Sequence, residues 1–303
     1  MNKLKIFVFK IIFSLILFSG SSYAKNIPPG SGIGDVPANI LILLDKSGSM
    51  SVRMTSGSGF MYPYSAAADS SGDVYVGSYW TYGIKKLTYA TVAVDASFAS
   101  SGTYTGSGNC RSYYPMNIKI HNGYMYVASY YQHRVFRVNL STGACDWNHY
   151  IRYARNIAIG NNILYATGYY GNAVIRNLST NSNISCSWSG NLKSYTDYGS
   201  MAVDASGNNL YGFEFRYIYR FPINQSNKCP STGYASRIRT NANYVFGADT
   251  HPSDDKILYI NNYYSHRVEK ITLNTSLNGI QSTSTAGRCC TGKSSSSNIR
   301  MYY

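Results

Sequence analysis

The chain has 303 residues, with 27 Lys and Arg against 13 Asp and Glu, a formal net charge of +14, and only 13% charged positions. Hydrophobic residues make up 44% of the chain, which excludes a disordered chain, a collagen-like chain and a charge-rich coiled coil. The 31 tyrosines, together with abundant Ser, Asn and Gly, favour strands joined by polar turns, so we expect a mostly β protein.

Residues 1–24 have the features of a secretory signal peptide. Lysines open the segment, an apolar run extends from Ile11 to Phe18, and Ala24 offers a small residue for cleavage. The run is too short to span a bilayer and no second run follows, so we expect export without a transmembrane segment. The expected location is secreted, periplasmic or on the cell surface.

The segment 25–61 carries a candidate metal-binding motif. A continuous apolar run, Asn39 to Leu44, is typical of a strand buried on both faces, and it ends in Asp45-Lys46-Ser47-Gly48-Ser49. One carboxylate and two hydroxyls at alternate positions after such a strand are the oxygen ligands that Mg²⁺ prefers. The pattern predicts Asp45, Ser47 and Ser49 as metal ligands.

Residues 36–50 resemble the opening of a von Willebrand factor A domain, an α/β domain whose metal-ion-dependent adhesion site begins with D-x-S-x-S. They are most similar to A domains of bacterial surface proteins and PilY-type pilus-tip adhesins. The resemblance implies Mg²⁺ or Ca²⁺ at the motif. The loops that would complete the site do not follow, so we expect weak metal binding. Residues 291–303 resemble the turn after such a motif, which predicts that another domain is inserted between the two segments.

An internal repeat organises residues 62–290. Its most regular feature is a tyrosine within a short apolar segment, at Tyr75, Tyr126, Tyr165, Tyr211 and Tyr259. Repeats of about 40 to 50 residues with turn signals before each apolar segment are typical of propeller blades of four strands. The A-x-D-x-x-G, Y-V and H-R-V elements resemble NHL repeats. We therefore predict a closed five-bladed β-propeller with each tyrosine on a second strand, although irregular sequence from Thr91 to Gly108 leaves room for a sixth blade.

Six cysteines lie in the part that would be exported, where disulfides are stable: Cys110, Cys145, Cys186, Cys229, Cys289 and Cys290. Cys145, Cys186 and Cys229 follow their repeat tyrosines at similar distances, which predicts positions on outermost strands. Outer strands of neighbouring blades diverge, so we do not expect equivalent cysteines to pair, and the connectivity stays open. No zinc-type spacing is present.

Aromatic residues follow each repeat tyrosine at the turn into the third strand. The predicted ring comprises Tyr79, Trp80, Tyr130, Tyr131, Tyr169, Tyr170, Phe213, Phe215, Tyr263 and Tyr264. These turns open onto one face of a propeller, and aromatics on turns supply rigid contact area for binding. The alternative is that the rings pack between blades.

A basic residue recurs on each predicted third strand, at Lys86, Arg137, Arg176, Arg220 and Lys270. Together with the aromatics, these bases suit a protein partner or an acidic surface polymer; nucleic acid is possible but not favoured. Solvated strand ends are the alternative interpretation. Asp69, Asp204 and Asp249 recur in phase, and turn formation accounts for them.

We interpret the chain as an exported adhesion or binding protein rather than an enzyme, since no nucleophile motif, H-E-x-x-H or Walker loop is present. The alternatives are a propeller enzyme of the lactonase or lyase class and a pilus-associated assembly scaffold. Carboxylates or imidazoles lining the channel would favour the enzyme.

Overall fold

The computed structural model describes residues 63–288, apart from 79–81, 90–92, 188–199, 243–244, 246 and 263–266. Several predictions from the sequence concern residues outside this set and stay predictions. They are the signal peptide, the α/β segment with Asp45, Ser47 and Ser49, the segment 291–303, and the aromatics Tyr79, Trp80, Tyr263 and Tyr264.

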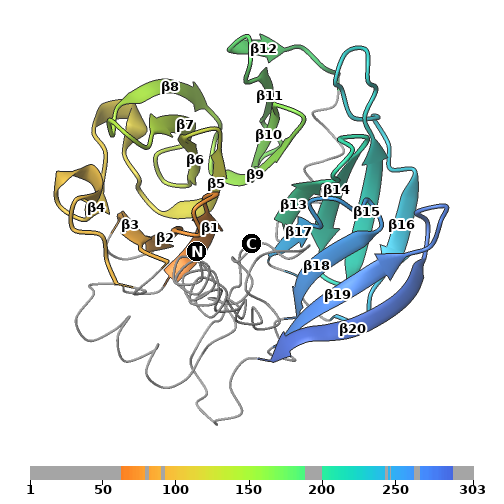
Figure 1. Cartoon of the computed structure of the whole chain (residues 1–303). Coiled ribbons are helices and arrows are strands. Elements are labelled where there is room, and N and C mark those ends of the chain that lie inside the picture. The colour runs from red at the N-terminus through yellow and green to blue at the C-terminus, as the bar shows by residue number, and fades with distance from the viewer. Residues whose placement is uncertain are drawn as a thin grey trace, which may run out of the picture. The chain divides into compact units, whose positions relative to one another are not determined.

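The described residues form a five-bladed β-propeller, in which each blade is a four-stranded sheet (Figure 1). Blade 1 consists of β1 (Pro63–Ala68), β2 (Val74–Ser78), β3 (Ile84–Leu87) and β4 (Thr103–Tyr104). Blade 2 consists of β5 (Pro115–His121), β6 (Tyr124–Ser129), β7 (Arg134–Asn139) and β8 (Cys145–Tyr150). Blade 3 consists of β9 (Ala154–Gly160), β10 (Ile163–Gly168), β11 (Ala173–Asn177) and β12 (Ser182–Ile184).

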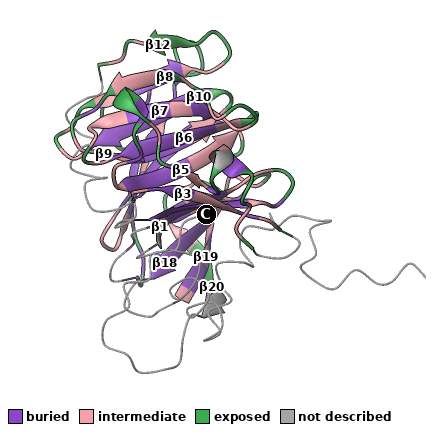
Figure 2. Ribbon diagram, turned by 90° about the vertical axis from the view of Figure 1, so that its left-hand side faces the viewer, coloured by how far each residue is buried: buried purple, intermediate pink, exposed green. Residues whose placement is uncertain are grey.

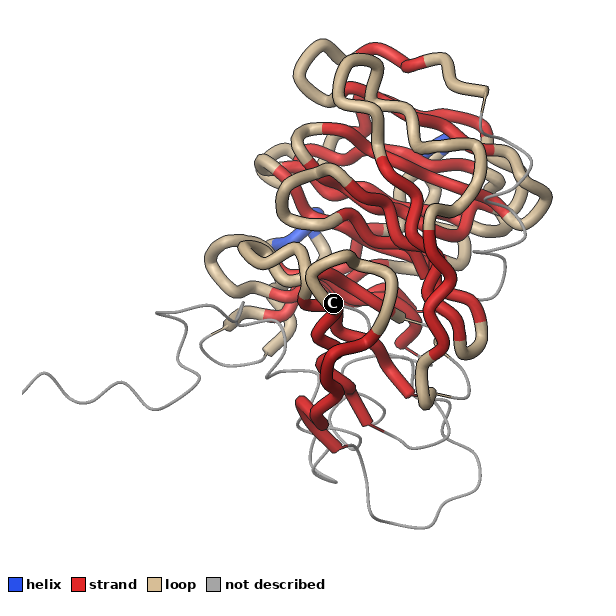
Figure 3. Tube along the Cα trace, turned by 90° about the vertical axis from the view of Figure 1, so that its right-hand side faces the viewer, coloured by secondary structure: helices blue, strands red, loops and turns tan. Residues whose placement is uncertain are grey.

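Blade 4 consists of β13 (Ser200–Val203), β14 (Asn209–Glu214), β15 (Tyr217–Pro222) and β16 (Ser236–Arg239). Blade 5 consists of β17 (Ala248–Thr250), β18 (Ile257–Asn262), β19 (Arg267–Leu273) and β20 (Ile280–Arg288). Helix is confined in the described chain to two 3₁₀ turns, η1 (Phe98–Ser100) and η2 (Gly108–Cys110), the short blue segments of Figure 3. No described helix is long and apolar enough to cross a membrane.

Strands pair in chain order within each blade, and every pairing is antiparallel. The first strands of successive blades contact one another, β1 with β5, β5 with β9, β9 with β13 and β13 with β17. First strands are therefore innermost and fourth strands outermost. Residues 93–107, in the segment where the sequence leaves room for a sixth blade, supply η1 and β4 to blade 1 instead.

The repeat positions predicted from the sequence have equivalent places in all five blades. Each repeat tyrosine lies on a second strand and is at most 5% exposed. The β-branched residue that follows it on the third strand is also buried in every blade: Ile84, Val135, Val174, Ile218 and Val268. The prediction that the repeat tyrosines occupy second strands is confirmed.

Four hydrophobic cores lie between neighbouring blades of the described chain, and a fifth is formed by residues of blade 1. Tyr75 packs with Ile118 and Phe136 of the next blade, and Tyr165 packs with Met201 and Phe221. Tyr126 and Tyr211 likewise belong to the clusters shared by blades 2 and 3 and by blades 4 and 5. Figure 2 shows this burial along the middle strands, with exposed residues gathered at turns and on outer β12. Each blade is thus stabilised by its neighbours.

Aspartates stabilise the turn between the first two strands, as predicted, in two blades. The carboxylate of Asp69 accepts hydrogen bonds from the N–H groups of Ser71 and Asp73. Buried Asp204 accepts from the N–H groups of Asn208 and Asn209 in the same way. For Asp249 the turn interpretation is wrong, because it lies within β17 and forms an ion pair with another blade, described below.

The expectation that equivalent cysteines do not pair is also wrong. Cys186 of blade 3 and Cys229 of blade 4 form a disulfide with a Cα–Cα distance of 5.7 Å. Cys186 follows the short strand β12, and Cys229 lies in the loop between β15 and β16, so loops rather than diverging strands carry the bridge. The second disulfide joins Cys110 of η2 to Cys145 at the start of β8.

Candidate ligand-binding face

Two kinds of segment meet at one end of the blades. In an antiparallel four-stranded blade, the turn between second and third strands lies at the same end as the connector that enters the next blade. Tyr130 and Tyr131 form such a turn in blade 2, and the connector that enters this blade contains Tyr113 and Tyr114. Rings from turns and connectors can therefore meet.

Backbone hydrogen bonds hold each turn to its connector. The N–H of Tyr130 donates to the carbonyl oxygen of Tyr114 at 3.0 Å, and the N–H of Tyr131 donates to that of Tyr113 at 3.3 Å. Blade 3 repeats the bond, from the N–H of Tyr169 to the carbonyl oxygen of Tyr153 at 3.1 Å. The positions of these rings are thus tied to the propeller scaffold.

The rings form one continuous cluster over blades 1 to 3, which we name the tyrosine face. Its members are Tyr64, Tyr82, Tyr113, Tyr114, Tyr130, Tyr131, Tyr153, Tyr169 and Tyr170. The ring centroids of Tyr82 and Tyr113 are 4.3 Å apart and stacked, and Tyr113 is 5.9 Å from Tyr131. Tyr130 is 4.8 Å from Tyr153, which is 5.5 Å from Tyr170. The Tyr82–Tyr113 pair is a close stack, and the other distances lie within the range of favourable ring pairs.

The two tyrosines of a turn differ in exposure. Tyr131 is 48% exposed and Tyr170 is 45% exposed, whereas Tyr130 and Tyr169 are half-buried. Tyr130 lies between Tyr114 and Tyr153 of two successive connectors, and burial raises the pKa of its hydroxyl. The first ring of the blade 2 turn therefore packs between blades, while the second ring is exposed.

Exposed arginines lie over these rings. The guanidinium carbon of Arg111 is 5.4 Å from the Tyr113 ring centre, and that of Arg152 is 4.3 Å from the Tyr170 ring centre. Both side chains belong to connectors. The segments 111–114, 130–134, 150–155 and 169–172 contain four arginines and no acidic residue. The tyrosine face is consequently positive as well as aromatic.

His133, at the end of the blade 2 turn, contacts the connector that leads into blade 3. Its Nδ1 accepts a hydrogen bond of 2.9 Å from the N–H of Tyr153, and its ring meets the Tyr153 ring edge-on at 4.3 Å. Burial, followed by the positive charge of Arg152, lowers the pKa of His133 below its usual range. The imidazole is therefore neutral near pH 7, as its acceptor role requires.

Several residues of this face have left-handed backbone conformations. Tyr82, Tyr114, His133 and Tyr153 have φ angles of 49°, 66°, 57° and 50°. Such angles are uncommon for bulky residues, and each costs about 1 to 3 kcal/mol that the surrounding structure must offset. Strain of this kind clusters at binding and catalytic sites.

The predicted third-strand bases have partners elsewhere in the blades. Lys86 Nζ is 2.8 Å from Asp73 and 3.3 Å from Asp95, and Arg137 makes a two-bonded pair with Asp146 at 2.8 and 2.9 Å. Lys86 and Arg137 are thus held by ion pairs with carboxylates of their own blades. The guanidinium carbon of Arg137 also lies 4.4 Å from the ring centre of Tyr124, which is not a member of the tyrosine face.

The remaining third-strand bases are also accommodated locally. Arg176 donates to Asn181 and Asn183 and lies over the ring of Trp147. Arg220 donates to Asn209 and Ser236 within blade 4. Lys270 lies half-buried on β19 opposite Tyr259.

Sequence reasoning found Tyr130, Tyr131, Tyr169 and Tyr170 but missed the connectors. Tyr113-Tyr114 and Arg152-Tyr153 directly precede the first strands of blades 2 and 3. The available signal was the recurrence of aromatic residues before a first strand, in phase with the turn aromatics. Turn and connector become neighbours only through the antiparallel path of the blade.

At the centre of the propeller, an ion pair joins two blades that are not consecutive. Lys119 Nζ of β5 lies 2.6 Å from Asp249 Oδ2 of β17. The positive charge of the Lys119 ammonium group thus balances the negative charge of this carboxylate. The described residues contain no group of three or more His, Cys, Asp and Glu side chains placed to hold a metal ion.

No protein-family model and no curated protein matches the sequence. Solved structures match over most of the chain. A chain in the crystal structure of the mitotic checkpoint complex has a TM-score of 0.54 at 12% identity, covering 76% of this chain and 66%, just under two thirds, of that chain.

The WD40 β-propeller domain of Doa1 has a TM-score of 0.54 at 10% identity, covering 75% of this chain and 70% of that domain. Virginiamycin B lyase from Staphylococcus aureus has a TM-score of 0.49 at 14% identity, covering 77% of this chain and 71% of that chain. At such identities a likeness concerns the fold alone. The WD40 comparison supports a β-propeller.

Proposed function

We propose that this chain is an exported binding protein that holds an acidic surface polymer on the tyrosine face. The observation that carries the proposal is the continuous array of rings over three blades, with Arg111 over half-buried Tyr113 and Arg152 over exposed Tyr170. Rings give contact area at low entropic cost, and arginines neutralise the negative charges of a polymer.

The extent of the face favours a polymer over a small ligand. The rings run from Tyr82 of blade 1 to Tyr170 of blade 3 as a chain of neighbouring contacts, with Tyr131 and Tyr170 exposed. A polymer can contact several rings and arginines together, so that weak individual contacts add up.

Two disulfides support the exported part of the proposal. Cys110–Cys145 and Cys186–Cys229 are both formed in the structure. Disulfides persist in oxidising surroundings and are rare in the cytosol. An acidic polymer of a cell surface is therefore a more accessible ligand than intracellular nucleic acid.

Salt dependence of binding to heparin, a soluble acidic polysaccharide, tests the electrostatic half of the proposal. Each arginine that contacts the polymer should add about one counterion to the logarithmic salt slope. Replacing both Arg111 and Arg152 with Ala should lower the slope by about 2, measured by fluorescence anisotropy of labelled heparin.

Arg137→Ala is the control, because Arg137 already pairs with Asp146. It should leave the slope of heparin binding unchanged. Equal slopes for the wild type and the Arg111/Arg152 variant would place the polymer elsewhere on this basic protein. Tighter binding to single-stranded poly(dT) than to heparin would show that the preferred ligand is a nucleic acid rather than a polysaccharide.

A further inference from the structure

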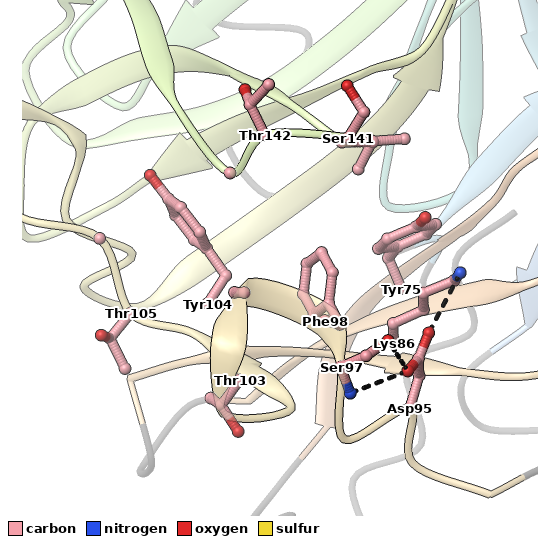
Figure 4. A pocket seen from close by; sticks show the side chains of 14 residues that line it. Tyr75, Lys86, Asp95, Ser97, Phe98, Thr103, Tyr104, Thr105, Ser141 and Thr142 are labelled. Carbon is pink, nitrogen blue, oxygen red and sulfur yellow. Dashed lines mark hydrogen bonds and ion pairs between the residues drawn. The ribbon is translucent and has the colours of Figure 1, made fainter.

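A cavity lies between blades 1 and 2, and none of the rings of the tyrosine face lines it. It has a volume of about 510 Å³ and is lined by β3, β4 and η1 of blade 1 and by the turn from Leu140 to Gly143 of blade 2 (Figure 4). Small-molecule sites typically measure about 300 to 1,000 Å³. The cavity is thus of a size that holds a small ligand.

The lining combines hydroxyl groups with aromatic rings. Ser97, Thr103 and Thr105 lie on the blade 1 side, and Ser141 and Thr142 lie on the opposite side. Phe98 and Tyr104 lie between them, as the close view shows. Ser97 Oγ and Ser141 Oγ already donate to Asp95 and Asn139, so these two hydroxyls offer a ligand their lone pairs. The wall therefore complements a ligand that carries hydroxyl groups itself.

The charges of the cavity are already compensated. Lys86 contacts the carboxylates of Asp73 and Asp95, and Asp95 also accepts hydrogen bonds from the N–H and Oγ of Ser97. The hydrogen bonds from Ser97 and the charge of Lys86 lower the pKa of Asp95, so it is ionised at neutral pH. An anion would have to displace two carboxylates from Lys86. A neutral ligand meets no such cost.

The walls are held in place without a ligand. The hydroxyl of Tyr104 donates to the carbonyl oxygen of Cys110, whose disulfide ties this wall to blade 2. On the other side, Asn139 Oδ1 accepts from the N–H groups of Ser141 and Thr142. A preorganised wall loses little entropy on binding.

We propose that this cavity binds a neutral carbohydrate of one or two sugar units. Sugar hydroxyl groups match the Ser and Thr hydroxyls and the free lone pairs of Asp95, and the C–H faces of a sugar ring pack against Phe98 and Tyr104. The site is independent of the tyrosine face, since it shares none of its rings.

The test is saturation-transfer NMR of the whole chain with maltose, cellobiose and N,N′-diacetylchitobiose, each at millimolar concentration. At least one should receive saturation from the protein, and added salt should not weaken its binding because the ligand is neutral. Thr142→Trp should fill the cavity and weaken that binding about tenfold or more.

Thr180→Trp is the matched control. The β11–β12 turn Asn177-Leu178-Ser179-Thr180 repeats the sequence of the cavity turn, and Asn177 accepts from the N–H groups of Ser179 and Thr180 in the same way. This variant should bind as the wild type does. Thr105→Trp blocks the cavity from the other wall, so a folding defect in one blocking variant leaves the other for the test.

Two results would overturn the proposal. One is that none of the three disaccharides receives saturation. The other is that both blocking variants, with wild-type melting temperatures, bind the sugar as tightly as the wild type. Loss of heparin binding in tyrosine-face variants would leave the sugar result unaffected, so the two proposals fail separately.

Discussion

At the scale of single residues, the repeat tyrosines share their packing but not their hydrogen bonds. The hydroxyl of Tyr165 donates to the carbonyl oxygen of Lys228 at 3.1 Å, which reaches from blade 3 to blade 4. The hydroxyl of Tyr211 is buried and has no hydrogen-bond partner among the residues that the structure describes. A buried hydroxyl that lacks a partner costs free energy, so these two positions should respond differently to its removal.

Tyr165→Phe should lower the free energy of unfolding by about 1 kcal/mol, because it removes a formed hydrogen bond. Tyr211→Phe should leave stability unchanged or raise it, because it removes an unpaired polar atom. Urea unfolding of both variants measures the difference. A larger loss at Tyr211 than at Tyr165 would contradict this account of the two hydroxyls.

The imidazole of His133 should make stability depend on pH. Its folded-state pKa lies below the ordinary value of 6.5, so the unfolded chain binds the proton more readily. The stability from neutral His133 is complete above pH 6.5 and is lost as the pH falls from 6.5 through the folded pKa. An NMR titration of the His133 ring should give a pKa below 6.5.

In His133→Gln the amide oxygen can still accept from the N–H of Tyr153, but it does not titrate. The free energy of unfolding of this variant should therefore fall less than that of the wild type between about pH 7 and pH 5. His149 also has a pKa lowered by burial, so part of the pH dependence should remain. A His133 pKa above 6.5 would contradict the neutral acceptor role.

At the scale of elements, the residue that lets the turn contact the connector differs between blades 2 and 3. Ser129 ends β6, and its Oγ donates towards the carbonyl oxygens of Arg111 and Tyr113. Gly168 occupies the same place at the end of β10. A Cβ there would lie 2.3 Å from the carbonyl oxygen of Arg152, so only glycine allows this connector to approach.

Gly168→Ala should force the connector away from the turn and cost about 1 to 3 kcal/mol of stability, as overpacking does. Gly233→Ala is the control, since a Cβ at Gly233 has no heavy atom within 4 Å. Thermal unfolding of the two variants gives the comparison. Equal melting temperatures would show that the connector does not depend on glycine at this position.

At the scale of the whole molecule, the sequence was informative wherever a blade repeats a local pattern. The repeat tyrosine and the β-branched residue after it form one hairpin, so their spacing is set by neighbouring strands such as β6 and β7. The five repeats predicted five blades, and the sixth blade that the sequence left open is not among the sheets of the described residues. The place of such a residue in the blade is determined by the sequence within a few residues of it.

Contacts between distant segments could not be predicted in this way. The Cys186–Cys229 bridge depends on the reach of two loops, and the Lys119–Asp249 pair joins strands that are 130 residues apart. Connector tyrosines such as Tyr113 join the tyrosine face only because antiparallel blades return the chain to the same end. Two of the predicted third-strand bases have acidic partners that the sequence pattern did not reveal, Lys86 with Asp73 and Arg137 with Asp146.

The central claim is that the exposed rings of the tyrosine face, rather than exposed tyrosines in general, bind the polymer. The chain offers a matched comparison, because Tyr131 and Tyr170 are 48% and 45% exposed on the face, whereas Tyr89 and Tyr234 are 50% and 43% exposed outside it. Each pair can be replaced with Ala without opening a buried core.

The most direct measurement is the affinity for heparin of the Tyr131/Tyr170 and Tyr89/Tyr234 double alanine variants at one salt concentration. The first should bind at least about fivefold more weakly than the wild type, a loss of about 1 kcal/mol, and the second should bind as the wild type does. Equal affinities of the two variants would contradict the account.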